Sequence, residues 1–248
     1  AGGLLKGDLI SLNVDSVSRN NALRQAATVS GVAITSRGNP TSGLASAVSN
    51  VDFTMVANLD TYESRLISLS GTVTSEPASA GGGYKSVSID TTGTVGNPNY
   101  RLRLPAALMD TLAFGPQCTA TIAAVPMWRF NAQAQPSPFV NAEVTASTCP
   151  APALVSATGQ NLTTVNVLFN RDLTPATVVP ANFTVGGAAT LAVSAAVLSG
   201  TRTVVLTTAT QTLGANYTVT GSAAITDLRG TASSANTVNF TAVAAVCH

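Results

Sequence analysis

The apolar residues of this chain lie in many short segments, and this pattern constrains the fold more strongly than any other feature. The segments are rich in Val, Ala, Leu and Thr and are separated by Gly, Pro and Asn, which is typical of buried strands. With 45% hydrophobic residues and a mean hydropathy of +0.31, the chain is too apolar for general disorder. No apolar run approaches the roughly 20 residues that cross a bilayer. The sequence therefore predicts a folded, mainly β protein without a transmembrane segment.

The charged residues argue against two functional classes. The 12 basic and 11 acidic residues are spread evenly, so no part has the basic excess that binding to nucleic acid backbones needs. Nucleic acid is therefore not expected as a main partner. The one histidine is the last residue, His248. Because active sites usually need a positioned base or a cluster of titratable groups or metal ligands, we predict that the protein is not an enzyme.

The cysteines indicate an oxidising compartment. Cys118 opens one alternating run and Cys149 closes another, so antiparallel pairing of these runs would bring the two sulfur atoms together. We predict a disulfide between them, which implies export; two unrelated buried thiols are the alternative. Cys247 and His248 form only half of the C-x-x-C-H pattern for covalent haem attachment. Haem is therefore not expected.

The segment Cys149-Pro150-Ala151-Pro152 marks the main domain boundary. Two prolines favour an extended connector, and the density of charged residues falls after them. We predict three parts, namely an N-terminal β segment or partial module (1–59), a barrel (60–149) and a sandwich (150–248). Residues 1–59 carry strand patterns but no motif that assigns them a role.

The middle part has the element order of an OB-fold. Strands are expected over 66–74, 84–90 and 100–104, then a helix over 106–112, then two strands around the cysteines. A helix between the third and fourth of five strands is the order of this small Greek-key barrel. Residues 60–73 also resemble the opening strand of OB-like domains of large exported bacterial proteins, some of which stand beside extracellular nuclease domains. No nuclease domain is visible in this sequence.

The last part contains about seven short strands in fewer than 100 residues, which indicates a β-sandwich of immunoglobulin-like size. Residues 153–242 resemble the bacterial Ig-like domain of S-layer and other exported surface proteins, on segments 165–175, 182–185, 213–220 and 225–230. The pattern departs at Arg171 and Arg229. The resemblance implies a location outside the cell or on its surface.

Two sets of residues are candidates for binding. The first would lie on the groove of the barrel, where aromatic rings and arginines suit sugars or unstacked bases: Trp128, Arg129, Phe130, Tyr84, Tyr100, Arg101 and Arg103. Alternatively, Trp128 and Phe130 cover the barrel end as core, and Arg129 pairs with a carboxylate. The second set is Asp172 and Asp227, at turns where related Ig-like domains hold calcium; ordinary turn-forming aspartates are the alternative. No other cofactor is expected.

These observations favour a non-catalytic secreted or cell-surface protein with a structural or interaction role. Its partners would be copies of itself, other surface proteins or polysaccharide. Self-assembly would use the N-terminal segment, which could pair with an exposed sheet edge of a neighbour. The alternative is an OB-type accessory module that binds oligosaccharide or single-stranded nucleic acid for a separate extracellular enzyme. Catalysis by a carboxylate pair such as Asp60 and Glu63 finds no support in the spacing.

Overall fold

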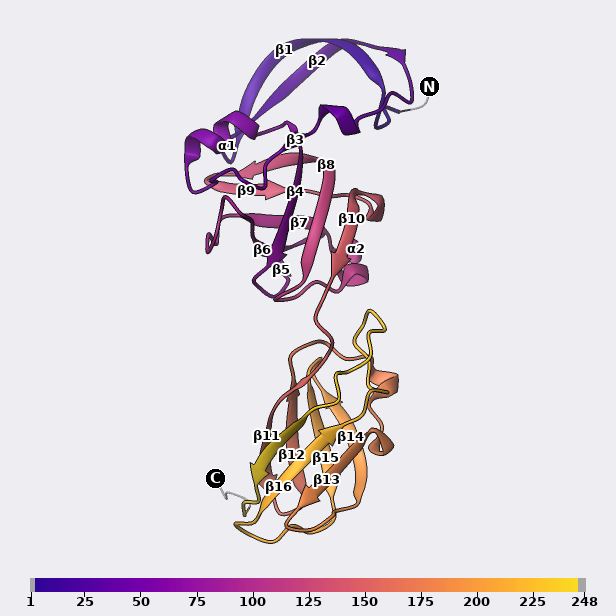
Figure 1. The fold of residues 1–248 in the computed structure, drawn as a ribbon. Coiled ribbons are helices and arrows are strands. Elements are labelled where there is room, and N and C mark those ends of the chain that lie inside the picture. The colour runs from indigo at the N-terminus through magenta and orange to yellow at the C-terminus, as the bar shows by residue number, and fades with distance from the viewer. Residues whose placement is uncertain (1–2, 245–248) are drawn as a thin grey trace. The chain divides into compact units, whose positions relative to one another are not determined.

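The computed structural model describes residues 3–244. The chain divides into two compact units, with the boundary in the sequence between Cys149 and Pro150. Both units are mainly β (Figure 1). No helix in residues 3–244 is long and apolar enough to span a membrane. The fold class expected from the sequence is confirmed, and each unit has a hydrophobic core of its own.

The first unit begins with a long hairpin that arches beside the barrel (Figure 1). Strands β1 (Leu9–Asn20) and β2 (Leu23–Ser36) pair antiparallel and form a two-stranded sheet with no third strand. Near its base, Lys6 Nζ lies 2.7 Å from Glu143 Oε1. At its tip, the N–H of Asn131 donates to the carbonyl of Asn21. The hairpin is therefore fixed to the barrel at both ends.

The barrel follows the OB order of strands. Strand β4 pairs with β6 and β8, β6 pairs with β7, and β8 pairs with β9 and β10, all antiparallel. A parallel bridge between Tyr100 and Ala134 connects the β7 side to β9 and closes the ring. The helix α2 lies between the third and fourth barrel strands, as predicted. The elements are β4 (Leu66–Val73), β6 (Tyr84–Asp90), β7 (Arg101–Pro105), α2 (Ala106–Leu112), β8 (Thr119–Phe130), β9 (Gln133–Pro136) and β10 (Val144–Thr148).

Five smaller elements complete the described part of this unit, and Gly71 in β4 allows two of its strands to pack closely. The elements are η1 (Ser42–Leu44), β3 (Ser46–Ala47), α1 (Val56–Tyr62), β5 (Ala78–Ser79) and η2 (Asn141–Glu143). A Cβ atom on Gly71 would lie 2.4 Å from the carbonyl oxygen of Asp90. Only glycine therefore lets β4 approach β6 this closely.

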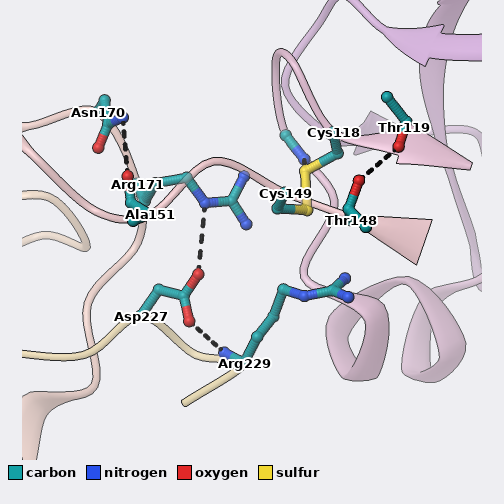
Figure 2. Close-up of a disulfide and its surroundings, with 10 residues drawn as sticks. Cys118, Thr119, Thr148, Cys149, Ala151, Asn170, Arg171, Asp227 and Arg229 are labelled. Atoms are coloured by element: carbon teal, nitrogen blue, oxygen red, sulfur yellow. Dashed lines mark hydrogen bonds and ion pairs between the residues drawn. A yellow bond between two sulfur atoms is a disulfide. The ribbon is translucent and has the colours of Figure 1, made fainter. Parts of the chain in front are cut away.

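The predicted disulfide is present. Cys118 and Cys149 are bonded, with their Cα atoms 4.0 Å apart, at the adjacent ends of β8 and β10. Figure 2 shows the bond beside Thr119 and Thr148, whose hydroxyl oxygens lie 2.6 Å apart. The disulfide therefore joins the ends of the two strands that the sequence pattern paired.

The second unit is a sandwich of a four-stranded and a three-stranded sheet. The orders are β11-β12-β15-β14 and β13-β16-β17, and every pair is antiparallel. The hydroxyl of Tyr217 accepts a hydrogen bond from the N–H of Thr212 (3.0 Å), an arrangement like the tyrosine corner of Ig-like folds. The elements are β11 (Leu154–Asn161), β12 (Thr164–Phe169), η3 (Pro175–Thr177), η4 (Pro180–Asn182), β13 (Phe183–Gly187), β14 (Val193–Ser199), β15 (Thr203–Thr208), β16 (Asn216–Gly221) and β17 (Thr237–Thr241).

Candidate functional site

A groove of about 440 Å³ lies on the barrel next to the tip of the N-terminal hairpin. Four parts of the first unit form its walls: strands β6 and β7, the β5 segment, the β8–β9 hairpin and the β1–β2 turn. The volume falls in the range of small-ligand sites. In an OB barrel, the usual ligand face is formed by strands two and three, the loop after strand one and the loop between strands four and five. Here β6 and β7 are strands two and three, the β5 segment lies in the loop after the first strand, and the β8–β9 hairpin corresponds to the last of these loops.

The structure brings most of the residues that the sequence singled out to this groove. Arg101, Arg103, Trp128, Arg129 and Phe130 line it, and the ring of Tyr84 lies 3.6 Å below the guanidinium carbon of Arg103.

Tyr100 is a correction, because its side chain is fully buried in the barrel. Its ring packs 4.9 Å from that of Phe53. Tyr100 immediately precedes β7, and strand alternation sends its side chain inward while Arg101 points outward. Tyr100 is therefore a core residue and not part of the binding face.

Residues 128–130 lie at the end of strand β8. Trp128 and Phe130 are 41% and 46% exposed, whereas Arg129 between them is buried. Consecutive side chains of a strand point to opposite faces, which explains the difference. Arg129 therefore pairs with carboxylates, as the alternative interpretation predicted. Trp128 and Phe130 do not belong to the core, which that same interpretation had expected.

Arg129 is the centre of an ion-pair cluster behind the groove. Its Nη1 donates to Asp60 and, at 3.1 Å, to Glu63 Oε2, and its Nε donates to the carbonyl of Asn131 (2.7 Å). Arg24 of the hairpin lies 3.4 Å from Glu63 Oε1. Asp60 and Glu63 are thus held by arginines, an arrangement that stabilises the attachment of the hairpin and does not resemble an acid–base pair.

The cluster shifts the pKa of two of its members. The hydrogen bond from Arg129 holds the pKa of Asp60 below its ordinary value. Burial alone would lower the pKa of Arg129, but the hydrogen bonds and charges of Asp60 and Glu63 outweigh it and raise that pKa. Both shifts favour the charged forms.

The exposed surface of the groove is cationic and aromatic. The Nε of Arg101 donates to the carbonyl of Pro98 (2.8 Å), and Arg103 packs on Tyr84, with its guanidinium 5.8 Å from the ring centre of Trp128. Within residues 3–244, neither arginine forms an ion pair with a carboxylate. The lining contains no Asp or Glu.

The fourth wall, which contains Asn20 and Asn21, was not predicted from the sequence. Asn21 and Ala22 both have positive φ, 47° and 68°, as a type I′ two-residue hairpin turn requires. The asparagine pair between two strand patterns was a signal for the turn. Nothing local indicated that the turn would fold back onto the barrel.

The two aspartates predicted for calcium have protein partners. Asp172 Oδ1 accepts from Arg202 Nε at 2.6 Å. Asp227 Oδ1 accepts from the N–H groups of Arg229 (2.9 Å) and Thr231 (2.8 Å), and its Oδ2 faces Arg171 at 3.6 Å (Figure 2). Across residues 3–244, no group of three His, Cys, Asp or Glu side chains could hold a metal. Calcium binding stays a prediction, and Cys247 and His248 lie outside the described residues.

Comparisons with known proteins found one matching family and several similar solved structures. Residues 141–242 match the family described as bacterial Ig-like domain. A crystal structure of the N-terminal part of the bacterial S-layer protein SbsC is similar, with 26% identity and a TM-score of 0.36 over 38% of this chain and 24% of that chain. A structure of SbsC domains 1–6 has the same identity and TM-score, over 38% of this chain and 14% of that chain. This chain thus corresponds to a quarter or less of these structures. No curated protein sequence matches it.

Proposed function

We propose that this chain, in which residues 141–242 match the bacterial Ig-like domain, is a non-catalytic part of an exported bacterial surface protein with a structural and interaction role. The disulfide supports an oxidising compartment. The commitment of Asp60 and Glu63 to Arg129 supports a role without acid–base chemistry. These are the observations on which export and the structural role rest.

The observation that carries the interaction role is an apolar face on the N-terminal hairpin. The register places Ile10 opposite Ile34, Val14 opposite Val29 and Val17 opposite Ala26, and directly opposite residues share a face. The other face is polar, with side-chain hydrogen bonds Ser16–Thr28, Gln25–Ser18 and Ser30–Asp15. The hairpin is therefore amphipathic although no other strand covers its apolar side.

Several of these side chains are exposed to solvent. Val14 is 51% and Val17 78% exposed, and an isolated two-stranded hairpin is only marginally stable in water. One face of a two-stranded hairpin is small beside the roughly 1,200–2,000 Å² that specific interfaces bury. We propose that the occupant is a second copy of the chain.

A two-fold arrangement suits this face. Arg19 and Arg24 stand opposite each other at one end of the hairpin only. When two hairpins pack face to face in opposite directions, the arginine pairs lie at opposite ends and do not repel one another. The valine rows then meet at the centre of a self-complementary interface. Association through so small a surface is expected to be weak.

Light scattering coupled to size-exclusion chromatography tests self-association. We expect the mean mass to rise with concentration, and the double variant Val17→Lys/Val29→Lys to be monomeric because it places four like charges in the two-copy interface. Ser18→Lys, on the polar face of the same strand, is the matched control and should still associate. If the double variant and the control associated equally, the apolar face would not be the interface.

A second candidate function is ligand binding in the barrel groove, as an accessory to a separate enzyme. It is favoured by the position of the groove on the face that OB barrels use and by the exposure of Trp128 there. Trp128 is the only tryptophan, so its fluorescence reports on this groove directly. A titration with oligosaccharides and short single-stranded DNA should change the emission; no response at millimolar ligand would contradict the proposal.

A further inference from the structure

The geometry of the groove points to an acidic polysaccharide as its ligand, with carboxylates of the sugar chain bound by Arg101 and Arg103. This inference rests on the ligand-binding function proposed above and adds the chemical class of the ligand. Three features of the groove carry it: the unneutralised arginines, the way they are held, and a single exposed indole.

The two arginines differ from three other arginines of the first unit in their partners. Arg24, Arg37 and Arg129 each pair with a carboxylate. Arg101 and Arg103 stand two residues apart on β7 and therefore on the same face of the sheet. With no Asp or Glu in the lining, two positive charges face the groove without compensation inside it. An anionic ligand would supply that compensation.

Both guanidinium groups are held in place before a ligand arrives. The Nε of Arg101 donates to Pro98 at 2.8 Å, and one Nη lies 3.5 Å from the hydroxyl of Ser86. Arg103 is held against the ring of Tyr84. These contacts occupy only part of the donor capacity of a guanidinium, which carries five N–H groups. The remaining donors can bind a planar carboxylate with little loss of side-chain entropy.

Trp128 and the polar lining favour a sugar over a nucleic acid. Trp128 offers one exposed aromatic surface, and Gln133, Gln135 and Asn20 add amide groups that can bond hydroxyls. Single-stranded nucleic acid is bound by successive stacking platforms and by many basic residues. Here two exposed rings, Trp128 and Phe130, line the groove, but only Arg101 and Arg103 face it without a carboxylate partner, which is fewer basic groups than a nucleic acid strand needs. Two arginines beside these rings match a sugar chain that bears carboxylates.

The test is isothermal titration of the full chain with tetragalacturonate, with maltotetraose as the neutral comparison, at low and high salt. We expect binding of the uronate only, weakened by salt. Arg101→Gln and Arg103→Gln should each weaken it about tenfold, the loss expected for one charged hydrogen-bonding partner. Arg65→Gln, an exposed arginine outside the lining, is the matched control. Arg103→Lys keeps the charge and tests whether loss of packing on Tyr84 explains the effect.

Each other outcome overturns the inference in a recognisable way. If maltotetraose bound equally well and the arginine variants had no effect, the groove would be a binding site for a neutral sugar, and the inference of an acidic ligand would be wrong. A thymidine oligonucleotide that binds more tightly than tetragalacturonate would replace polysaccharide by nucleic acid. No heat and no change in Trp128 fluorescence with any of the three probes would overturn both this inference and the ligand-binding function.

Discussion

At the scale of single residues, strand alternation divides adjacent side chains between two tasks. Trp128 and Phe130 face outward from β8, while Arg129 turns inward to Asp60 and Glu63. The same alternation buries Tyr100 and leaves Arg101 half-buried on the opposite, groove side. A run of residues that suggests one binding motif in the sequence thus contributes to both the groove and the framework behind it.

The lowered pKa of Asp60 makes the first unit sensitive to acid. Because the folded-state pKa is below the ordinary value, the stabilisation is fully present above the unfolded-state pKa of about 3.9 and is lost as the pH falls through the lower folded-state pKa. We expect Asp60→Asn to reduce stability at pH 6 and the difference from wild type to shrink as the pH falls below about 4. Urea unfolding followed by Trp128 fluorescence measures this; a difference that is constant with pH would contradict it.

The hydroxyl of Tyr100 lies in the barrel core and makes no hydrogen bond to any residue in the described part of the chain. Burial raises the pKa of Tyr100. Since burying an unpaired hydroxyl is costly, Tyr100→Phe should stabilise the protein by about 1 kcal/mol. Tyr217→Phe is the matched control and should destabilise by a similar amount, because it removes the bond to Thr212. Calorimetry compares the two, and destabilisation by both changes would argue against this account.

At the scale of elements, the N-terminal hairpin is the part whose role depends most on its surroundings. Its two strands have no neighbour in their sheet, and its ends are attached through Lys6, Asn21 and Arg24. The turn places Asn20 and Asn21 in the groove wall, and the strands between the ends present the apolar face. One element thus takes part in both proposed interactions.

The turn of this hairpin carries a conformational cost at Ala22, whose φ is 68°. An alanine in the left-handed region costs about 1 kcal/mol relative to glycine. Ala22→Gly should therefore slow hydrogen exchange of the β1 and β2 amides, whereas Ala33→Gly, within β2, should speed it. Faster exchange in Ala22→Gly would show that the left-handed alanine does not limit the hairpin.

The disulfide constrains two strands, because it joins the ends of β8 and β10, whose cysteines are 31 residues apart in the sequence. In the chain-entropy view, removing a loop of this size from the denatured state is worth roughly 3 to 4 kcal/mol. We expect Cys118→Ala/Cys149→Ala to lose about that much stability in guanidinium titrations followed by Trp128 fluorescence. Wild type measured with a strong reductant should match the variant; an unchanged midpoint in both would contradict the prediction.

At the scale of the whole molecule, the chain combines two separately cored β units. The barrel core contains Ile89 and Met127, and the sandwich core contains Phe169 and Val219. Under the surface role proposed above, one unit would carry the interactions and the other would serve as a structural spacer.

Separate cores predict two calorimetric transitions. The Cys118→Ala/Cys149→Ala variant should lower only one of them, because the bond lies within the first unit. Calcium should leave both unchanged if arginines keep Asp172 and Asp227 occupied. A calcium-dependent rise of the other transition would instead support the calcium site predicted from the sequence. A single transition shifted as a whole would contradict independent units.

From the sequence alone came most of the strands, the position of the barrel helix, the Ig-like pattern and the pairing of Cys118 with Cys149, whereas β9 was not predicted. These depend on alternation, turn residues and local spacing, which act over a few residues. It also identified most of the groove, because the single tryptophan, Trp128, stands beside an arginine and a phenylalanine in a chain with few aromatic and charged residues.

Only the tertiary structure decided which of those residues face the ligand side and which are used inside. The inward turn of Arg129, the burial of Tyr100 and the contribution of Asn20 and Asn21 follow from contacts between segments far apart in the chain. The apolar side of the hairpin likewise becomes visible only when the register of β1 and β2 is known. A shift of one residue in the pairing of a strand moves each of its side chains to the other face of the sheet. The face on which a side chain lies is therefore decided only when the sheets assemble.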